Sequence, residues 1–184
     1  TIHLCDPNIP GQGSHGWIQP AHLLVNTVAG QITMYSDPSC LGAGPIMPGP
    51  SFQEWANLRG YRKVNGRFVL SSTGEEIQEN DYLPRSFLGE YLTSVYDAIM
   101  ERLPDSVEAV NHRREAVDIK QMEDGRFEVE LYGGFALDAD FVFLTTGHGE
   151  SEPDDFDNQF TDWLADGGRK NSQLQYFRTP YPIT

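Results

Sequence analysis

The stretch from Asp138 to Gly149 constrains the fold more than any other part of the chain. Two acidic residues precede an unbroken apolar run, Phe141–Leu144, and small, turn-forming residues follow it. An apolar run of this kind, closed by glycine, is typical of a strand buried on both faces in a parallel sheet. Thr146-Gly147-His148-Gly149 allows a sharp turn at the carboxyl end of the strand, where α/β sheets place their ligands. An ordinary strand followed by a glycine turn explains the same residues equally well.

Composition narrows the class of protein. The 184 residues are enough for one sizeable domain, and 39% hydrophobic residues can form a packed core. The net charge of −14 argues against a nucleic-acid partner, because phosphate binding needs a basic face. Cys5 and Cys40 lie far apart without metal-ligand spacing, which suits a reducing compartment. No stretch approaches the ~20 apolar residues that cross a bilayer. We therefore expect a cytoplasmic protein without a metal or a membrane partner.

The first fifty residues combine one strand with a long irregular segment. Thr1–Pro7 alternates and predicts a strand that ends at Asp6. An acid there either caps the turn, the commoner role for Asp-Pro, or binds both hydroxyls of a ribose. The abrupt beginning, matched by an abrupt end after Pro182, leads us to expect a chain truncated at both ends. Residues 8–50 are rich in glycine and proline yet partly apolar, and we expect them to wrap a ligand or a partner surface.

Two helices are predicted next, separated by a polar segment. Ser51–Arg59 is amphipathic and Ser51 can cap it, and a hairpin is expected within Gly60–Glu79. A longer helix follows Leu83-Pro84-Arg85 and extends to about Leu103, where Pro104 stops it. Arg85 is informative because a cation near a helix start works against the helix dipole, although a surface arginine is the commoner outcome.

Residues 106–137 change to the two-residue period of strands. A short strand is predicted at Val107–Val110, a hairpin from Ala116–Gln121 and Arg126–Tyr132, and Phe135–Leu137 leads into the central strand. This alternation predicts an α/β, Rossmann-like fold with an inserted antiparallel β meander at 106–137. Residues 150–184 are expected to be an acidic loop and a linker, with a helix at Phe156–Ala165 closed by Gly167-Gly168.

Four segments, in chain order, carry a resemblance to a known family. They are Asp6-Pro7, His22–Gln31 with Asp37-Pro38, Leu83-Pro84-Arg85 with Gly89–Leu92, and Leu144–Gly149. Singly each likeness is weak, but together they span nearly the whole chain. They resemble the FAD/NAD(P)-binding family of two-dinucleotide flavoproteins, which includes class B flavin monooxygenases and N-hydroxylating monooxygenases. Thr145 replaces the alanine of that family's Ala-Thr-Gly strand end.

The resemblance implies FAD and NAD(P)H as cofactors and a small-molecule substrate. It implies that Asp6 binds the adenosine ribose and that Asn26 lies by the isoalloxazine ring. It further implies that Arg85 approaches the cofactor or its neighbouring loop, and that the Ala116 backbone meets the adenine. Thr146 and Gly147 would pass close to the pyrophosphate or the flavin. The implied reaction is NAD(P)H-dependent reduction of FAD followed by oxygenation of a substrate. No catalytic residue is assigned.

The chain also departs from the family pattern. Neither glycine-rich dinucleotide fingerprint is present, so residues 1–184 are expected to form a partial FAD-binding domain that leads towards an NAD(P)-binding part. We expect the chain alone not to be a competent enzyme and a second chain or segment to supply the glycine-rich βα unit. The alternative is a non-catalytic binding module derived from a flavoprotein. A hydrolase using His148 is disfavoured, because there is no Gly-x-Ser-x-Gly elbow and no triad spacing.

Overall fold

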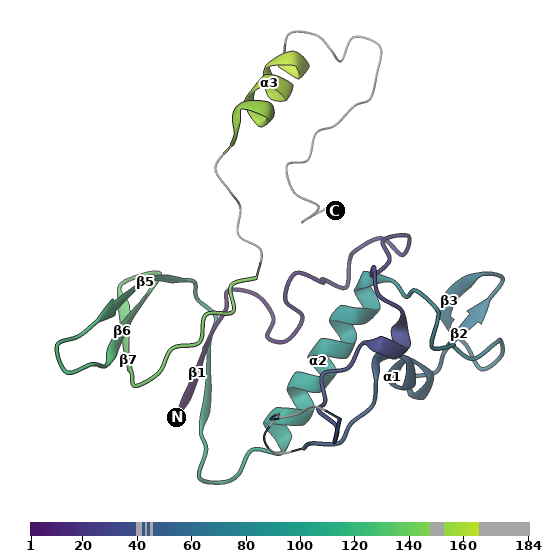
Figure 1. Cartoon of the computed structure of the whole chain (residues 1–184), viewed down its shortest axis with the longest axis horizontal. Coiled ribbons are helices and arrows are strands. Elements are labelled where there is room, and N and C mark those ends of the chain that lie inside the picture. The colour runs from purple at the N-terminus through teal and green to yellow at the C-terminus, as the bar shows by residue number, and fades with distance from the viewer. Residues whose placement is uncertain (40–41, 43, 45, 148–152, 166–184) are drawn as a thin grey trace. The chain divides into compact units, whose positions relative to one another are not determined.

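The computed structural model describes residues 1–39, 42, 44, 46–147 and 153–165 (Figure 1). The chain divides into two units, Thr1–Phe143 and Leu144–Thr184, and each is described by itself. The described residues form a mixed α/β structure with three small sheets. Within that part of the chain, no helix has both the length and the apolar character that a membrane span requires.

The first strand of the chain pairs in parallel with a strand more than a hundred residues later. β1 (Ile2–Cys5) lies beside β4 (Ala109–His112), with Ile2 opposite Ala109 and Cys5 opposite His112. The predicted first strand is confirmed, and the later strand begins two residues beyond its predicted start. The helix α2 (Arg85–Glu101) immediately precedes β4, and the Tyr96 hydroxyl donates to Asn111 Oδ1 at 2.8 Å. A helix leading into a parallel strand is the connection expected of α/β proteins.

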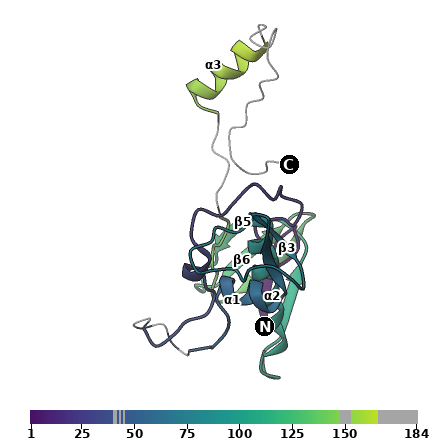
Figure 2. The same ribbon diagram turned by 90° about the vertical axis from the view of Figure 1, so that its right-hand side faces the viewer.

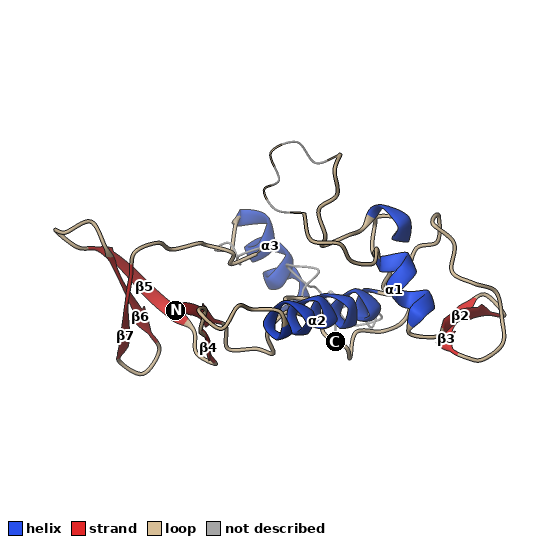
Figure 3. Cartoon of the chain, turned by 90° about the horizontal axis from the view of Figure 1, so that it is seen from below, coloured by secondary structure: helices blue, strands red, loops and turns tan. Residues whose placement is uncertain are grey.

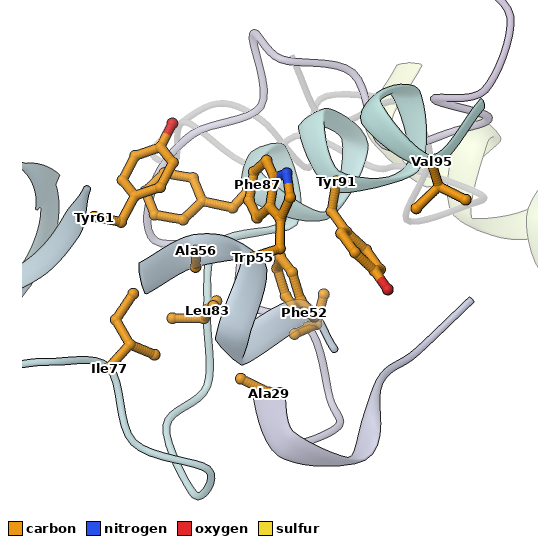
Figure 4. Packing of buried hydrophobic residues seen from close by; sticks show 11 residues of the cluster. Ala29, Phe52, Trp55, Ala56, Tyr61, Ile77, Leu83, Phe87, Tyr91 and Val95 are labelled. Atoms are coloured by element: carbon orange, nitrogen blue, oxygen red, sulfur yellow. The ribbon is translucent and has the colours of Figure 1, made fainter. Parts of the chain in front are cut away.

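The core of the first unit is an aromatic cluster between two helices. α1 (Phe52–Leu58) begins with a capping box, in which Ser51 Oγ accepts from Glu54 N and Glu54 accepts from Ser51 N. Its Phe52 and Trp55 pack against Tyr91 of α2, with ring centroids 5.4 and 5.7 Å away (Figure 4). Both predicted helices are therefore confirmed, and their apolar faces meet. The remaining buried members of the cluster are Val25, Ala29, Ala56, Tyr61, Ile77, Leu83, Phe87 and Val95.

A short hairpin is attached to this core by polar contacts. β2 (Tyr61–Val64) and β3 (Arg67–Leu70) pair across Asn65 and Gly66, which have φ values of 51° and 75° and form the left-handed turn that tight hairpins favour. Tyr61 donates its hydroxyl to both oxygens of Glu90, at 3.0 and 2.8 Å. The hairpin predicted within 60–79 is thus confirmed. The hydrogen bonds from Tyr61 to Glu90 connect it to α2.

The side chain of Asn57 holds buried Ile77 in place. Its amide donates to the Ile77 carbonyl at 2.9 Å, and its Oδ1 accepts from the Ile77 N–H at 3.0 Å. Gln53 Nε2 donates to the same carbonyl at 2.7 Å. Ile77 is fully buried, so these bonds satisfy backbone groups that would otherwise be costly to bury.

Most of residues 8–50 is irregular, with one 3-10 turn, η1 (Ala29–Gln31). The two ends of its later half meet at Tyr91. The Tyr91 hydroxyl accepts from Met34 N at 3.1 Å and donates to Pro50 O at 2.8 Å. Gly49 lies against the ring of Tyr35, where a Cβ would collide. These contacts close the stem of a surface loop over the described part of residues 34–50.

The predicted antiparallel meander is present. β5 (Ala116–Gln121), β6 (Phe127–Leu131) and β7 (Phe135–Ala139) form a three-stranded sheet in that order (Figure 3). Val129 and Leu131 of β6 are buried, whereas Glu128 and Glu130 alternate with them. The hairpin is confirmed, and Phe135–Leu137 belongs to the meander itself as its third strand.

The prediction of a buried central strand at Phe141–Leu144 is wrong for this structure. Residues 141–147 have no regular secondary structure, and Phe141, Phe143 and Leu144 are 81%, 87% and 72% exposed. A strand buried on both faces requires a hydrogen-bonded neighbour and a covering layer. Among the described residues, no strand pairs with this segment. An apolar run by itself therefore does not make a strand.

The second unit contains one described helix, α3 (Asp155–Trp163), shown again in Figure 2. Asp154 caps it, accepting from Asp157 N at 2.8 Å, and Asp157 accepts from Asp154 N at 3.1 Å. The helix was predicted from Phe156. Part of the segment that was expected to be an acidic loop therefore forms this cap and the first turn of the helix. Gly167-Gly168 and the linker beyond lie outside the described residues.

Candidate functional site

The predicted site residues fall into both units. Asp6, Asn26, Arg85 and Ala116 belong to the first, whereas Thr146 and Gly147 lie at the start of the second. Thr146 and Gly147 are exposed, and Gly147 has a φ of 68°, which favours glycine. His148 and Gly149 lie outside the described residues. The geometry of the site is therefore derived from the first unit.

Asp6 stands at the tip of β1, where the sequence placed it. Its backbone N–H donates to the His112 carbonyl at 3.1 Å, which extends the pairing of β1 and β4 by one residue. Its Oδ1 accepts from Asn8 N at 2.8 Å, so the carboxylate also forms the turn that follows the strand. The turn-forming role is thus observed, and it fixes the carboxylate at the end of a parallel strand. Ala116 begins β5 four residues after His112 and is exposed.

Two of the segments that carry the family resemblance pair with each other. Val25 N donates to Leu83 O at 2.9 Å and Arg85 N donates to Leu23 O at 2.8 Å, which brackets an antiparallel bridge between Leu24 and Pro84. Further along, Ala29 N and Gly30 N donate to Asp81 O and Glu79 O, both at 2.9 Å. The irregular segment therefore runs beside the approach to α2. Asn26 is exposed and directly follows Val25, which belongs to this pairing.

The earlier half of the long segment lies directly on α2 at two glycines. Gly11, with a φ of 91°, approaches Thr93 and Tyr96 so closely that a Cβ would lie 3.1 Å from the Thr93 Cα and 2.8 Å from the Tyr96 Cβ. Nearer the start of the helix, the His15 carbonyl lies against Gly89, where a Cβ would collide with it. Because Gly89 has no side chain, the backbone of the loop contacts the backbone of the helix there. This contact was not predicted, although a glycine in a helix interior is a signal for close packing.

Arg85 is placed at the junction of these segments. Its Nε donates to the Leu24 carbonyl at 3.2 Å, so the guanidinium is held against the loop. Its charge reaches His15: burial first, and then the neighbouring Arg85, lower the pKa of the His15 imidazole. His15 was not among the predicted site residues. The structure therefore adds a half-buried histidine to the one arginine in the predicted site.

Other candidate sites are weaker. Among the described residues, no group of three or more His, Cys, Asp or Glu side chains could hold a metal ion. An open hollow of about 640 Å³ beside α1 contains none of the predicted site residues. It is lined by Gly49, Pro50, Gln53, Glu54, Asn57, Leu58, Arg62 and Glu76. The contacts between the long segment and α2 remain the best-defined candidate site.

The fold and these segments define a class of protein. Residues 1–149 match the family described as FAD-NAD(P)-binding, and the chain belongs to that family. The resemblance inferred from the four segments is thereby confirmed, and FAD and NAD(P)H, the predicted cofactors, are those of the family.

Two of three similar proteins are named L-aspartate N-monooxygenases, and the third is named a nitrosuccinic acid synthase. The chain is 34% identical over 171 residues to an L-aspartate N-monooxygenase (nitrosuccinate-forming) of Streptomyces davaonensis, covering 86% of this chain and 26% of that protein. It is 34% identical over 151 residues to the nitrosuccinic acid synthase of Aspergillus oryzae, covering 80% and 21%. A second L-aspartate N-monooxygenase, of Streptomyces cremeus, is 33% identical over 164 residues, covering 83% and 24%. The chain thus spans about a quarter of the length of these relatives.

Proposed function

We propose that this chain is the FAD-binding part of an NAD(P)H-dependent flavin monooxygenase that oxygenates a small amino-containing substrate. The observation that carries the proposal is the pairing of Leu23–Val25 with Leu83–Arg85, since it joins two family segments into one site. The similarity to L-aspartate N-monooxygenases supports nitrogen as the atom oxygenated and an amino acid as the substrate class. When bound, FAD would supply the redox chemistry, accepting a hydride from NAD(P)H and, once reduced, activating O₂.

The residues present fit the cofactor. Asp6 is a carboxylate at a strand tip, and such an acid can accept hydrogen bonds from both hydroxyls of the adenosine ribose. The backbone of Ala116, an exposed residue four positions beyond the bonding partner of Asp6, is assigned to the adenine. Asn26 and Arg85, at the junction of the loop and α2, are assigned to the isoalloxazine end. Thr146 and Gly147 are assigned to the pyrophosphate or flavin.

A Rossmann-like fold is proposed for the complete FAD domain. β1 and β4 are parallel neighbours with α2 preceding β4, as in such a fold. Among the described residues, β1 pairs on one edge only, and its other edge is available for a further strand. We propose that a second chain or segment supplies that strand together with the glycine-rich turn.

The direct test is a flavin titration of the purified chain, followed by absorbance in the visible region and accompanied by an intact-mass measurement. We expect FAD to bind with a perturbed flavin spectrum, and Asp6→Ala and Arg85→Gln to weaken binding at least tenfold. Asp105→Asn, at an exposed acid in a turn outside the site, is the matched control and should bind normally. A folded chain that takes up no FAD, alone or with an added glycine-rich βα segment, would instead identify a non-catalytic binding module.

A further inference from the structure

A short linker, residues 113–115, joins the parallel pair β1–β4 to the meander. β4 ends at His112, whose carbonyl accepts from Asp6 N at 3.1 Å, so the linker starts at the carboxyl edge of this pair, beside the tip of β1. It ends where β5 begins, at Ala116. Ligands of α/β proteins bind at such a carboxyl edge. A side chain of this linker is therefore attached close to the two residues assigned to the adenosine, Asp6 and Ala116.

Arg114, in the middle of the linker, is stacked on an aromatic ring. Its guanidinium carbon lies 3.9 Å from the centroid of the Phe135 ring, at the start of β7. Its Nη1 donates to the Tyr132 carbonyl at 3.1 Å, and the Tyr132 N–H donates to the Glu115 carbonyl at 2.8 Å. Gly133, with a φ of 93°, leaves room for the stack, because a Cβ there would lie 2.9 Å from Nη1. These contacts fix the guanidinium over the turn between β6 and β7.

The pairing of the meander strands brings Phe135 and Ala116 to the same end of the sheet (Figure 3). Ala116 is opposite Leu131, and Leu131 is opposite Phe135, so these residues form one row across β5, β6 and β7. Residues opposite each other on paired strands point to the same face of the sheet. The ring beneath Arg114 therefore shares an end and a face of the meander with the residue assigned to the adenine.

The stacked pair is exposed and carries a charge that no acid neutralises. Arg114 is exposed, and Phe135 is 52% exposed. In the part of the chain that the structure describes, Arg114 forms no ion pair, whereas Arg126 pairs with Asp124 and Asp138 of the same sheet. A guanidinium is planar and weakly hydrated, so it stacks readily on rings. Purine bases stack both on aromatic side chains and on guanidinium planes.

We propose that the Arg114 guanidinium, supported from behind by the Phe135 ring, is a stacking platform for the adenine ring of FAD. One face of the guanidinium lies on Phe135, and the adenine stacks on the other face while its edge meets the Ala116 backbone. This assignment rests on the proposed function, which gives the adenine a backbone partner but no side chain. Arg114 becomes a binding residue that recognises a planar ring, and Phe135 and Gly133 become positioning residues.

The experiment measures the binding of AMP, the adenosine phosphate portion of FAD, to the full chain by saturation-transfer difference NMR and by calorimetry. We expect saturable binding in which H2 and H8 of the adenine receive more saturation than the ribose protons, because the stacked ring is in closest contact with the protein. Ribose 5-phosphate has the same sugar and phosphate but no base, so it should bind at least tenfold more weakly. A folded chain that shows no saturable AMP binding would overturn the proposal.

Variants separate stacking from general attraction between charges. Arg114→Lys keeps the charge but removes the plane, so it should weaken AMP binding about fivefold or more, as expected for the loss of one stacked base. Phe135→Leu, which removes the ring behind the guanidinium, should also weaken binding. Arg126→Lys, at another exposed arginine of the meander, is the matched control and should bind AMP normally. Normal AMP binding by folded Arg114→Lys would refute the platform.

FAD binding keeps this proposal distinct from the proposed function. A chain that binds AMP through Arg114 but takes up no FAD would support the platform and count against the FAD assignment. A chain that binds FAD, and whose Arg114→Lys variant loses affinity for FAD and AMP alike, would support both. A chain that binds FAD with the same affinity in the parent and in Arg114→Lys would refute the platform alone.

Discussion

The contact between His15 and Gly89 gives the sharpest test of where the loop lies. For the substitution Gly89→Ala, helix propensity predicts a gain in stability, whereas packing against the loop predicts a loss. Replacing a glycine in a helix interior by alanine normally stabilises the helix by about 1 kcal/mol. At Gly89 the added Cβ would collide with the His15 carbonyl, far inside the 3.4 Å at which ordinary contact begins. The atom met is backbone, so the loop has to move away as a whole.

The expected change in the free energy of unfolding is the packing cost less the gain in helix propensity. Forcing an extra methyl group into a packed contact costs about 1–3 kcal/mol, and the propensity gain offsets about 1 kcal/mol of it. Gly89→Ala should therefore lower the free energy of unfolding by up to about 2 kcal/mol. It should also release the loop, making residues 11–19 more sensitive to limited proteolysis. The measurements are urea unfolding followed by circular dichroism and a timed protease digestion.

Gly16→Ala is the matched control in the same loop. A Cβ at Gly16 would meet no atom within 4 Å, and no left-handed φ is required there. That variant should be neutral or slightly more stable, by about 0.4–1 kcal/mol, because alanine restricts the unfolded chain. If Gly89→Ala were about 1 kcal/mol more stable than the parent and equally resistant to protease, the seating of His15 on α2 would be refuted.

Two further predictions concern the polar contacts of the core. Asn57→Asp removes the amide that donates to Ile77 O and sets a carboxylate against that carbonyl, so urea unfolding should show a loss of about 1–3 kcal/mol, whereas Asn80→Asp at an exposed turn should show almost none. Burial, and then the Glu90 carboxylate, raise the pKa of the Tyr61 phenol, so the folded chain holds that proton more tightly than the unfolded chain. The free energy of unfolding should therefore fall as pH rises above about 10, the usual tyrosine pKa. Tyr61→Phe should reduce this dependence on pH while lowering the free energy of unfolding by about 1–2 kcal/mol at neutral pH. An unchanged pH dependence in that variant would contradict the role given to Tyr61.

Local patterns predicted the elements that depend on local interactions. Ser51 identified the start of a capped helix, Pro104 identified where the next helix stops, and the alternating runs Ala116–Gln121 and Arg126–Tyr132 identified a hairpin. Each signal is contained in a few neighbouring residues, whose side chains satisfy or interrupt backbone hydrogen bonds directly. These elements agree with the structure to within one or two residues at most ends.

Predictions that depended on distant partners were less complete. The apolar run Phe141–Leu144 has the composition of a buried strand, but a strand also needs neighbours, which no single segment can reveal. His15 was missed because its place is defined by Gly89, more than seventy residues later, through a backbone carbonyl rather than a recognisable side-chain motif. The family segments located Arg85 and Asn26, whereas the contacts that join them required the fold.

The hydroxyl of Tyr91 has a consequence for how this protein can diversify. By bonding Met34 N and Pro50 O, one buried side chain holds both ends of a surface loop, so the core does not depend on the length of chain between them. Doubling the length of such a loop adds only about 0.6 kcal/mol of closure entropy. Insertions between Tyr35 and Gly49 should thus be tolerated by the fold. We therefore expect that a new peptide can be grafted there without redesigning α1 and α2.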